Sequence, residues 1–167
     1  MILAANLGFP RIGSHRELKK ALESYWTGAT GADALHKTAA SLRARHWFSQ
    51  QKAGIDHIPS NDFSLYDQML DTIAMLGAVP RRFGHEGGAI PLDLYFGMAR
   101  GTKQAHAMEM TKWFDTNYHY IVPELSAGMA FALSSSKALD EFNEAKFLGV
   151  STRPVLIGPV TFLKLAK

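Results

Sequence analysis

The 167 residues are enough for one domain of ordinary size with a hydrophobic core of its own. Hydrophobic residues make up 47% and charged residues 20%, a balance typical of folded globular proteins that argues against disorder. The net charge of +3 is small and the basic residues are scattered, which argues against a nucleic-acid-binding protein. The absence of cysteine excludes disulfides, thiolate catalysis and every zinc motif that needs cysteine.

No segment has the length and apolar character of a membrane span, and the apolar start of the chain lacks the basic leader of a signal peptide. We therefore expect a soluble protein with no membrane partner. The lack of cysteine also fits a reducing compartment, so the expected location is the cytoplasm.

The first part of the chain predicts one strand and two amphipathic helices. Residues 2–5 form an apolar run without alternation, which suits a strand buried on both faces, as in a parallel sheet. Ser14 and Glu17 have the spacing of a capping box and predict a helix that Gly28 ends. Residues 30–33 resemble a second capping box, and a second helix follows. The stripe expected to face the core in this second helix is Leu35, Ala39, Leu42 and His46.

The middle of the chain predicts a short strand at residues 55–59, after Gly54 ends the second helix. A third helix follows, capped near Asp62, with an apolar stripe at helical spacing. This stripe consists of Leu65, Met69, Ile73 and Leu76. Residues 79–91 are rich in turn formers and predict a loop, and residues 92–100 predict another helix.

The last third predicts a strand at residues 131–133, a helix capped by Ser135 or Ser136, and an apolar strand at residues 154–157. A final apolar helix starts at residue 160 and reaches residue 167 without a cap, so we expect the chain to stop inside an element. Buried strands that alternate with helices predict an α/β fold with parallel pairing. A complete (β/α)₈ barrel needs about 250 residues. Residues 1–167 are therefore expected to form one incomplete barrel domain.

Three further patterns are better explained as ordinary structure than as functional sites. The seven histidines form neither an H-x-H nor an H-E-x-x-H pattern, so we expect no metal site in this chain. Residues 84–88 (GHEGG) match neither the P-loop nor the dinucleotide fingerprint and predict a turn. Residues 118–120 (YHY) could form a stacking surface, but dense aromatics are more often core.

The start of the first predicted helix carries an unusual concentration of positive charge. Arg16 and Lys19 are three residues apart and can project from one face of the first turns, with Lys20 beside them. A helix N-terminus already favours anions, so cations placed there stabilise the helix poorly and suit anion binding. A solvated helix face is the alternative interpretation.

Three stretches of sequence carry a resemblance to a known family. They are residues 7–21, which contain LGFPRIG and RELKKA, residues 109–120 (EMTKWFDTNYHY) and residues 153–161 (RPVLIGPVT). Their order and separation resemble those of the cobalamin-independent methionine synthases, and the likeness covers nearly the whole chain.

The resemblance implies a methyl transfer from a 5-methyltetrahydrofolate polyglutamate to homocysteine, which yields methionine. Members of the family have two (β/α)₈ barrels, of which the C-terminal barrel holds zinc and homocysteine and the N-terminal barrel helps to bind the folate tail. By resemblance, the tail-binding residues here are Arg16, Glu17, Leu18, Lys19 and Lys112. No catalytic residue is expected in this chain, and the zinc ligands belong to the missing C-terminal barrel.

These expectations define the partners of the chain as folate polyglutamate and the missing C-terminal barrel, with no nucleic acid. We expect the chain alone to be inactive. The alternative is a binding or assembly module without activity, because a partial barrel leaves unpaired strand edges that favour self-association.

Overall fold

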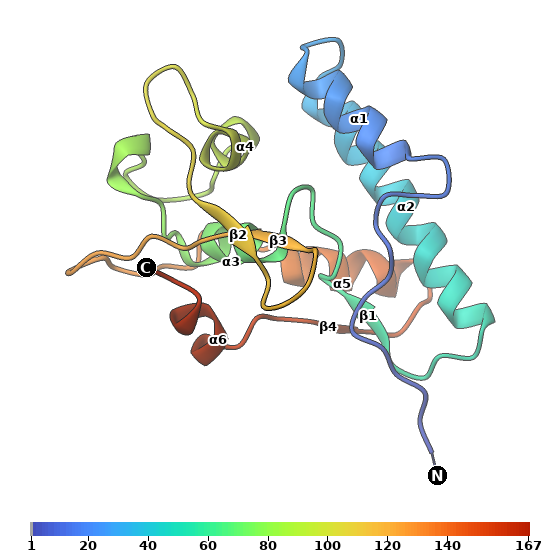
Figure 1. The fold of residues 1–167 in the computed structure, drawn as a ribbon. Helices are drawn as coiled ribbons and strands as arrows, with labels where there is room; N and C mark the ends of the chain where they lie inside the picture. The colour runs from blue at the N-terminus through green and yellow to red at the C-terminus, as the bar shows by residue number, and fades with distance from the viewer. Residues whose placement is uncertain (1) are drawn as a thin grey trace. The chain divides into compact units, whose positions relative to one another are not determined.

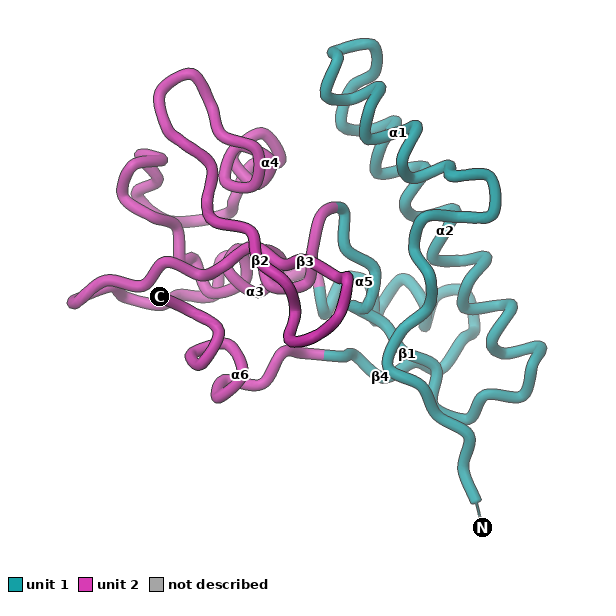
Figure 2. Tube along the Cα trace, viewed as in Figure 1, with its two compact units in different colours: residues 1–65, 138–155 teal, residues 66–137, 156–167 magenta. Residues whose placement is uncertain are grey.

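The computed structural model describes residues 2–167, which divide into two compact units (Figure 2). Unit 1 comprises residues 1–65 and 138–155, and unit 2 comprises residues 66–137 and 156–167. Figure 1 labels the helices and strands. In chain order they are α1 (Glu17–Trp26), α2 (Ala32–Lys52), β1 (Ile58–Ser60), α3 (Gln68–Leu76), the 3₁₀ helix η1 (Arg81–Phe83), α4 (Leu92–Arg100), β2 (Met110–Lys112), β3 (His119–Ile121), α5 (Lys137–Phe147), β4 (Thr152–Pro154) and α6 (Pro159–Lys164).

Unit 1 is built around parallel strand pairing. β1 pairs with β4 in parallel, with Ile58 opposite Thr152, and Ala5 forms a parallel bridge to His57. The three paired segments therefore lie in the order Ala5, β1, β4, and the chain between β1 and β4 contains helices and the β2–β3 hairpin. This arrangement confirms the α/β class and the parallel pairing, and within residues 2–167 the strands do not close into a barrel.

The buried strand expected at residues 2–5 is wrong, because only Ala5 pairs with the sheet. Ile2 is 98% exposed and Leu3 is 51% exposed. The N–H of Ala4 donates to the Asp56 carboxylate at 2.7 Å, so its donor is used by a side chain instead of a strand. An apolar run becomes a buried strand only where other layers cover both of its faces, and residues 2 and 3 have no such cover.

The long helix α2 supplies the core of unit 1. Its predicted stripe is buried as expected, with Leu35, Ala39 and Leu42 at most 2% exposed. On another side of α2, Trp47 packs with Ile58, Ala145 and Val150. The indole N–H of Trp47 also donates to the Pro59 carbonyl at 3.0 Å, which joins α2 to β1.

The capping residues of the first two helices differ from those predicted. Ser14 does not cap α1; the residue at the cap is Arg16, which makes no side-chain capping bond. Gly31, not Thr30, precedes α2, again without a side-chain cap. A capping box needs an extended backbone at the cap residue, and Arg16 instead has the left-handed values φ 59° and ψ 35°.

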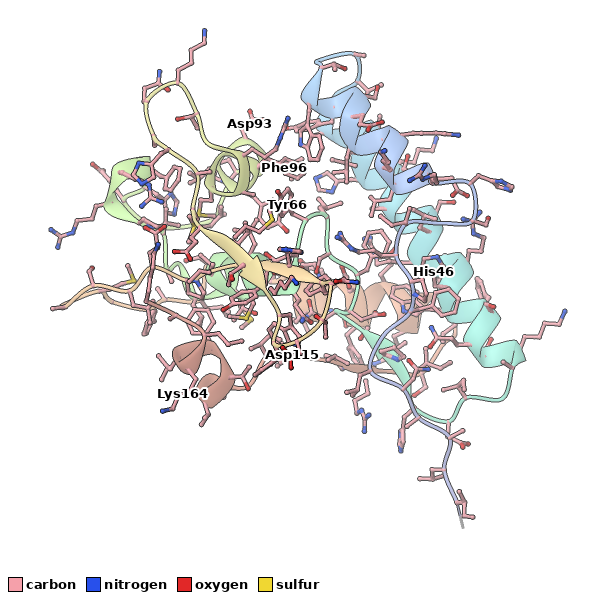
Figure 3. The ribbon with its side chains drawn as sticks, in the orientation of Figure 1. His46, Tyr66, Asp93, Phe96, Asp115 and Lys164 are labelled. Carbon is pink, nitrogen blue, oxygen red and sulfur yellow. The ribbon has the colours of Figure 1, made fainter. Side chains whose placement is uncertain are left out.

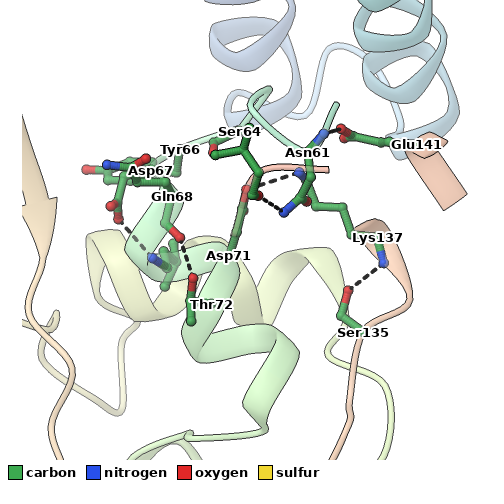
Figure 4. A network of polar contacts seen from close by, with 12 residues as sticks. Asn61, Ser64, Tyr66, Asp67, Gln68, Asp71, Thr72, Ser135, Lys137 and Glu141 are labelled. Atoms are coloured by element: carbon green, nitrogen blue, oxygen red, sulfur yellow. Dashed lines mark hydrogen bonds and ion pairs between the residues drawn. The ribbon is translucent and has the colours of Figure 1, made fainter. Parts of the chain in front are cut away.

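Unit 2 is organised around Asp67, which caps α3 in place of Asp62 (Figure 4). The Asp67 carboxylate accepts the N–H groups of Met69 and Leu70, and it also accepts the N–H of Ile121 from β3. Burial raises the pKa of Asp67 to about 6, against the opposing effect of these three donors. One carboxylate therefore fixes the start of α3 and joins this helix to β3.

The remaining elements of unit 2 match the sequence in part. α4 covers the residues expected, and β2 and β3 form an antiparallel hairpin. The Tyr95 hydroxyl donates to Asp71 at 2.6 Å, which links α4 to α3. The strand expected at residues 131–133 is wrong: this stretch has no strand pairing, and Leu133 is 82% exposed.

Strands after a loop are also displaced from their predicted positions. In unit 1, β4 ends at Pro154, where the predicted strand begins, because the residues that pair with β1 are set by register and not by apolar content. The cap expected for α5 is consistent with the Ser135 hydroxyl, which accepts the N–H of Lys137 at 3.3 Å.

None of the helices in residues 2–167 is long and apolar enough to cross a membrane.

Candidate functional site

The loop before α1 is folded onto the rest of unit 1 by several specific contacts. The N–H of Phe9 donates to the Asp62 carboxylate at 2.8 Å, and the Arg11 guanidinium donates to the Ser64 carbonyl. The Phe9 ring lies 4.6 Å from the ring of His46, which is labelled on α2 in Figure 3. These contacts fix the path by which the chain enters α1.

A tight turn then delivers the chain into the helix. Gly13 has φ +85°, a value that suits glycine, and its carbonyl accepts the N–H of Arg16 at 3.1 Å. The N–H of Leu18 donates back to the Ile12 carbonyl, also at 3.1 Å. Arg16 is left in the left-handed region, which is uncommon for a residue that is not glycine and is often found at functional sites.

The two predicted cations of α1 are available to a ligand. Arg16 is exposed, and among residues 2–167 its guanidinium has no ion-pair partner. Lys19 makes only a loose pair with Glu23, at 3.6 Å, and both of these side chains are at least half exposed. Such exposed pairs are worth little and exchange readily. Both charges lie at the N-terminal end of a ten-residue helix, where the positive end of the helix dipole also favours an anion.

The other two predicted residues of this segment have supporting positions. Glu17 pairs with Arg45 of α2 at 2.7 Å, and its second carboxylate oxygen accepts the N–H of His15 at 2.9 Å. The hydrogen bond from Arg45 is the main reason that the pKa of Glu17 falls to about 2. Leu18 is fully buried and anchors the helix in the core. Glu17 thus carries a negative charge that Arg45 already balances.

Lys112 lies in unit 2, whereas the four other predicted residues lie together in unit 1. It is the last residue of β2, is exposed, and stands opposite His119 of β3. The hairpin loop after it continues through Asp115, labelled in Figure 3.

The aromatic residues of this hairpin divide between core and surface. Tyr120 is 4% exposed and packs edge-on against Trp113, with ring centroids 5.6 Å apart. Phe114 is 65% exposed and has a left-handed φ of 50°. The core interpretation of residues 118–120 therefore holds for Tyr120 but not for Tyr118, which is 38% exposed, or for the exposed His119.

Three residues that support the site were missed by the sequence analysis. Arg45 is 28 positions from Glu17, and Asp62 is 53 positions from Phe9, so helical or strand spacing gives no signal for either contact. Gly13 did lie in a recognisable glycine-rich loop, but the sequence gives no signal that its φ is positive or that Leu42 of α2 lies against it.

Within the described part of the chain, no three His, Cys, Asp or Glu side chains come close enough to hold a metal ion.

A family model described as the N-terminal domain of the cobalamin-independent synthases matches residues 3–167. The chain belongs to this family. The match extends over both units, so the hairpin that carries Lys112 belongs to the same domain model as the start of α1.

Curated relatives of the synthase family are similar over almost the whole chain. Two of them, from Caulobacter vibrioides and Salinibacter ruber, are 58% and 57% identical over 99% and 100% of the chain. An Arabidopsis thaliana relative, named as chloroplastic, is 63% identical over 96% of the chain. All three are called 5-methyltetrahydropteroyltriglutamate–homocysteine methyltransferases. The chain spans only 20–24% of the length of these relatives.

Proposed function

We propose that this chain supplies the folate-tail-binding part of a methyltransferase that moves a methyl group from 5-methyltetrahydrofolate polyglutamate to homocysteine, giving methionine. The names of the relatives contain both the triglutamate donor and the homocysteine acceptor. The tail of such a donor is a string of carboxylates, so the part of the protein that holds it needs cations that are not already paired.

The observation that carries the proposal is the start of α1. Arg16 is exposed, unpaired within residues 2–167 and held in a strained backbone conformation, with Lys19 one turn further along. A guanidinium binds a carboxylate through a two-pronged contact, and an ammonium group adds point-charge attraction. Glu17 and Leu18 are proposed to support this segment without contacting the tail. The charge of Glu17 is balanced by Arg45, and the side chain of Leu18 is buried in the core. Lys112 is proposed as a further cation for the same tail.

The chemistry of the transfer assigns the remaining steps to residues outside this chain. A thiol acceptor must become a thiolate, which zinc achieves by lowering the thiol pKa, and the folate nitrogen needs protonation to leave. Residues 2–167 offer no set of metal ligands. We therefore propose that this chain alone is inactive and that the part of the relatives beyond its span holds the zinc and homocysteine.

The fold supports a finer proposal, that these residues are the first part of a (β/α)₈ barrel. Helices separate the parallel segments at Ala5, β1 and β4, as they separate the strands of such a barrel, and the β2–β3 hairpin is a further insertion between β1 and β4. The strained residues Arg16 and Asn61 both follow the carboxyl ends of these segments. Barrel enzymes bind their ligands at that end. We also propose that the protein works in the cytoplasm.

Calorimetric titration of the chain with triglutamyl and monoglutamyl 5-methyltetrahydrofolate tests the tail-binding proposal. We expect the triglutamate to bind more tightly, and Arg16→Gln and Lys19→Gln each to reduce this advantage by about threefold to tenfold. Lys52→Gln, at the far end of α2, is the matched control and should have no effect. If the Arg16 and Lys19 variants lost the same affinity for the triglutamate as for the monoglutamate, a role of these residues in tail recognition would be excluded.

A second candidate function is self-association. Within residues 2–167, β4 pairs only with β1, so its other edge is open. Phe147 of α5 is 92% exposed and Leu139 is 60% exposed. Open edges and apolar surface favour association with another copy. Sedimentation velocity over a range of concentrations would decide: a monomer at every concentration argues against this candidate.

A further inference from the structure

We propose that Arg45 is a positioning residue for tail recognition: through Glu17 it holds the strained turn that directs the Arg16 side chain. This inference rests on the proposed function, because it assumes that Arg16 contacts the tail. It adds a residue from α2 to the candidate site at the start of α1.

The first step of the argument is the conformation of Arg16. A left-handed residue other than glycine is strained, and it persists only where its surroundings determine it. The guanidinium of Arg16 has no ion-pair partner among residues 2–167 that could compensate for the strain. The restraint must therefore come from the residues on either side.

Glu17 provides that restraint from the C-terminal side. Its Oε2 accepts the N–H of His15, so the carboxylate folds back across Arg16 and bonds to the residue before it. It also lies against the turn itself, since a Cβ built on Gly13 would be only 2.2 Å from the same oxygen. A change in the Glu17 rotamer would therefore release both His15 and the packing at Gly13.

Arg45 selects this rotamer of Glu17. Its Nη2 donates to Oε1 of Glu17 at 2.7 Å, which leaves Oε2 directed at His15. Arg45 is itself held by α2, whose neighbouring residues Leu42 and His46 are buried. Leu42 also packs against the turn, because its Cδ2 would be 2.8 Å from a Cβ on Gly13. α2 thus acts as a rigid support for the turn, and Arg45 connects the two.

The charges point to the same role. The Arg45 side chain is 51% exposed, and exposed ion pairs contribute little to folding stability. Its effect is instead local: it orders one carboxylate and balances a negative charge that would otherwise repel the carboxylates of the tail. A direct contact between Arg45 and the tail is the competing explanation, and it makes a different prediction.

The test is a double-mutant cycle on the chain, with titrations of triglutamyl and monoglutamyl 5-methyltetrahydrofolate. Arg45→Gln is expected to weaken triglutamate binding by about threefold to tenfold, with little change for the monoglutamate. Arg45→Lys should recover part of the loss, because an ammonium can still pair with Glu17. Lys37→Gln, which removes an exposed charge from the same helix, is the matched control and should leave both affinities unchanged.

The Glu17→Gln background separates the two explanations. If Arg45 acts through Glu17, Arg45→Gln should have less than about a twofold further effect in that background. An undiminished effect there would mean that Arg45 touches the tail itself, and it would overturn the positioning role. Equal effects of Arg45→Gln and Lys37→Gln would also overturn it.

A ligand-free measurement keeps the inference independent of binding. Hydrogen exchange of the His15 amide should be faster in Arg45→Gln than in the wild type or in Lys37→Gln, because its acceptor is no longer held. Unchanged exchange would refute the mechanism whatever the affinities are. If instead the wild type shows no preference for the triglutamate while His15 exchange responds as expected, the proposed function fails and the positioning role of Arg45 in the turn remains.

Discussion

Replacing Gly13 by alanine is the sharpest available test of how the start of α1 is held. The new Cβ would lie 2.2 Å from Oε2 of Glu17 and 2.8 Å from Cδ2 of Leu42, and both distances are too short to be accepted without movement. The φ of +85° adds strain, because alanine tolerates this backbone region poorly.

The expected loss combines two contributions. The left-handed backbone costs alanine about 1 kcal/mol relative to glycine. Overpacking against the buried Leu42 adds about 1–3 kcal/mol. We therefore expect Gly13→Ala to lower the free energy of unfolding by about 2–4 kcal/mol.

Gly28 is a matched control for the backbone contribution. Its φ is +73°, but a Cβ there would meet no atom within 4 Å. Gly28→Ala should therefore cost about 1 kcal/mol only. Urea unfolding of the two variants, followed by tryptophan fluorescence, to which the buried Trp47 contributes, measures the difference between them. If both variants lose the same stability within about 0.5 kcal/mol, the close packing inferred around Gly13 is wrong.

Three further predictions concern other parts of the chain. The pKa of Asp67 is raised in the folded protein, so the folded form binds the proton more tightly than the unfolded chain does. The contribution of Asp67 to the free energy of unfolding is therefore full below about pH 4. It falls by up to about 3 kcal/mol as pH rises through about 6. Asp67→Asn should flatten that dependence in urea unfolding. The pKa of Glu17 is depressed, so its stabilising pair with Arg45 is present above about pH 4.5 and is lost as pH falls through about 2; NMR titration should show this pKa rising in Arg45→Gln. Phe147→Gln should change the free energy of unfolding by less than about 0.5 kcal/mol, yet reduce any self-association seen by sedimentation.

Apolar residues that repeat at helical spacing predicted the helices well. The stripe at Leu35, Ala39 and Leu42 identified the buried face of α2, and α4 has the predicted bounds. These elements were predictable because a helix repeats its apolar positions many times and the local pattern agrees with the tertiary packing.

Helix caps and short strands were predicted less well. Ser14 has the spacing of a cap, but the turn at Gly13 leaves Arg16 at that position in a conformation that excludes a capping box. Residues 131–133 are apolar enough for a strand, yet no partner strand lies beside them. A cap depends on the path of the preceding loop, and a strand depends on its neighbour, so neither is encoded in a short window.

The cations of the candidate site follow from the sequence itself, through their place at the start of a helix and their likeness to a family motif. Which of them is free to bind an anion was decided only by the fold. Arg16 remains unpaired within residues 2–167, while Glu17 is matched with Arg45 from another helix. The physical reason is that charge is a property of one residue, whereas its neutralisation depends on residues that the fold brings within a few ångströms.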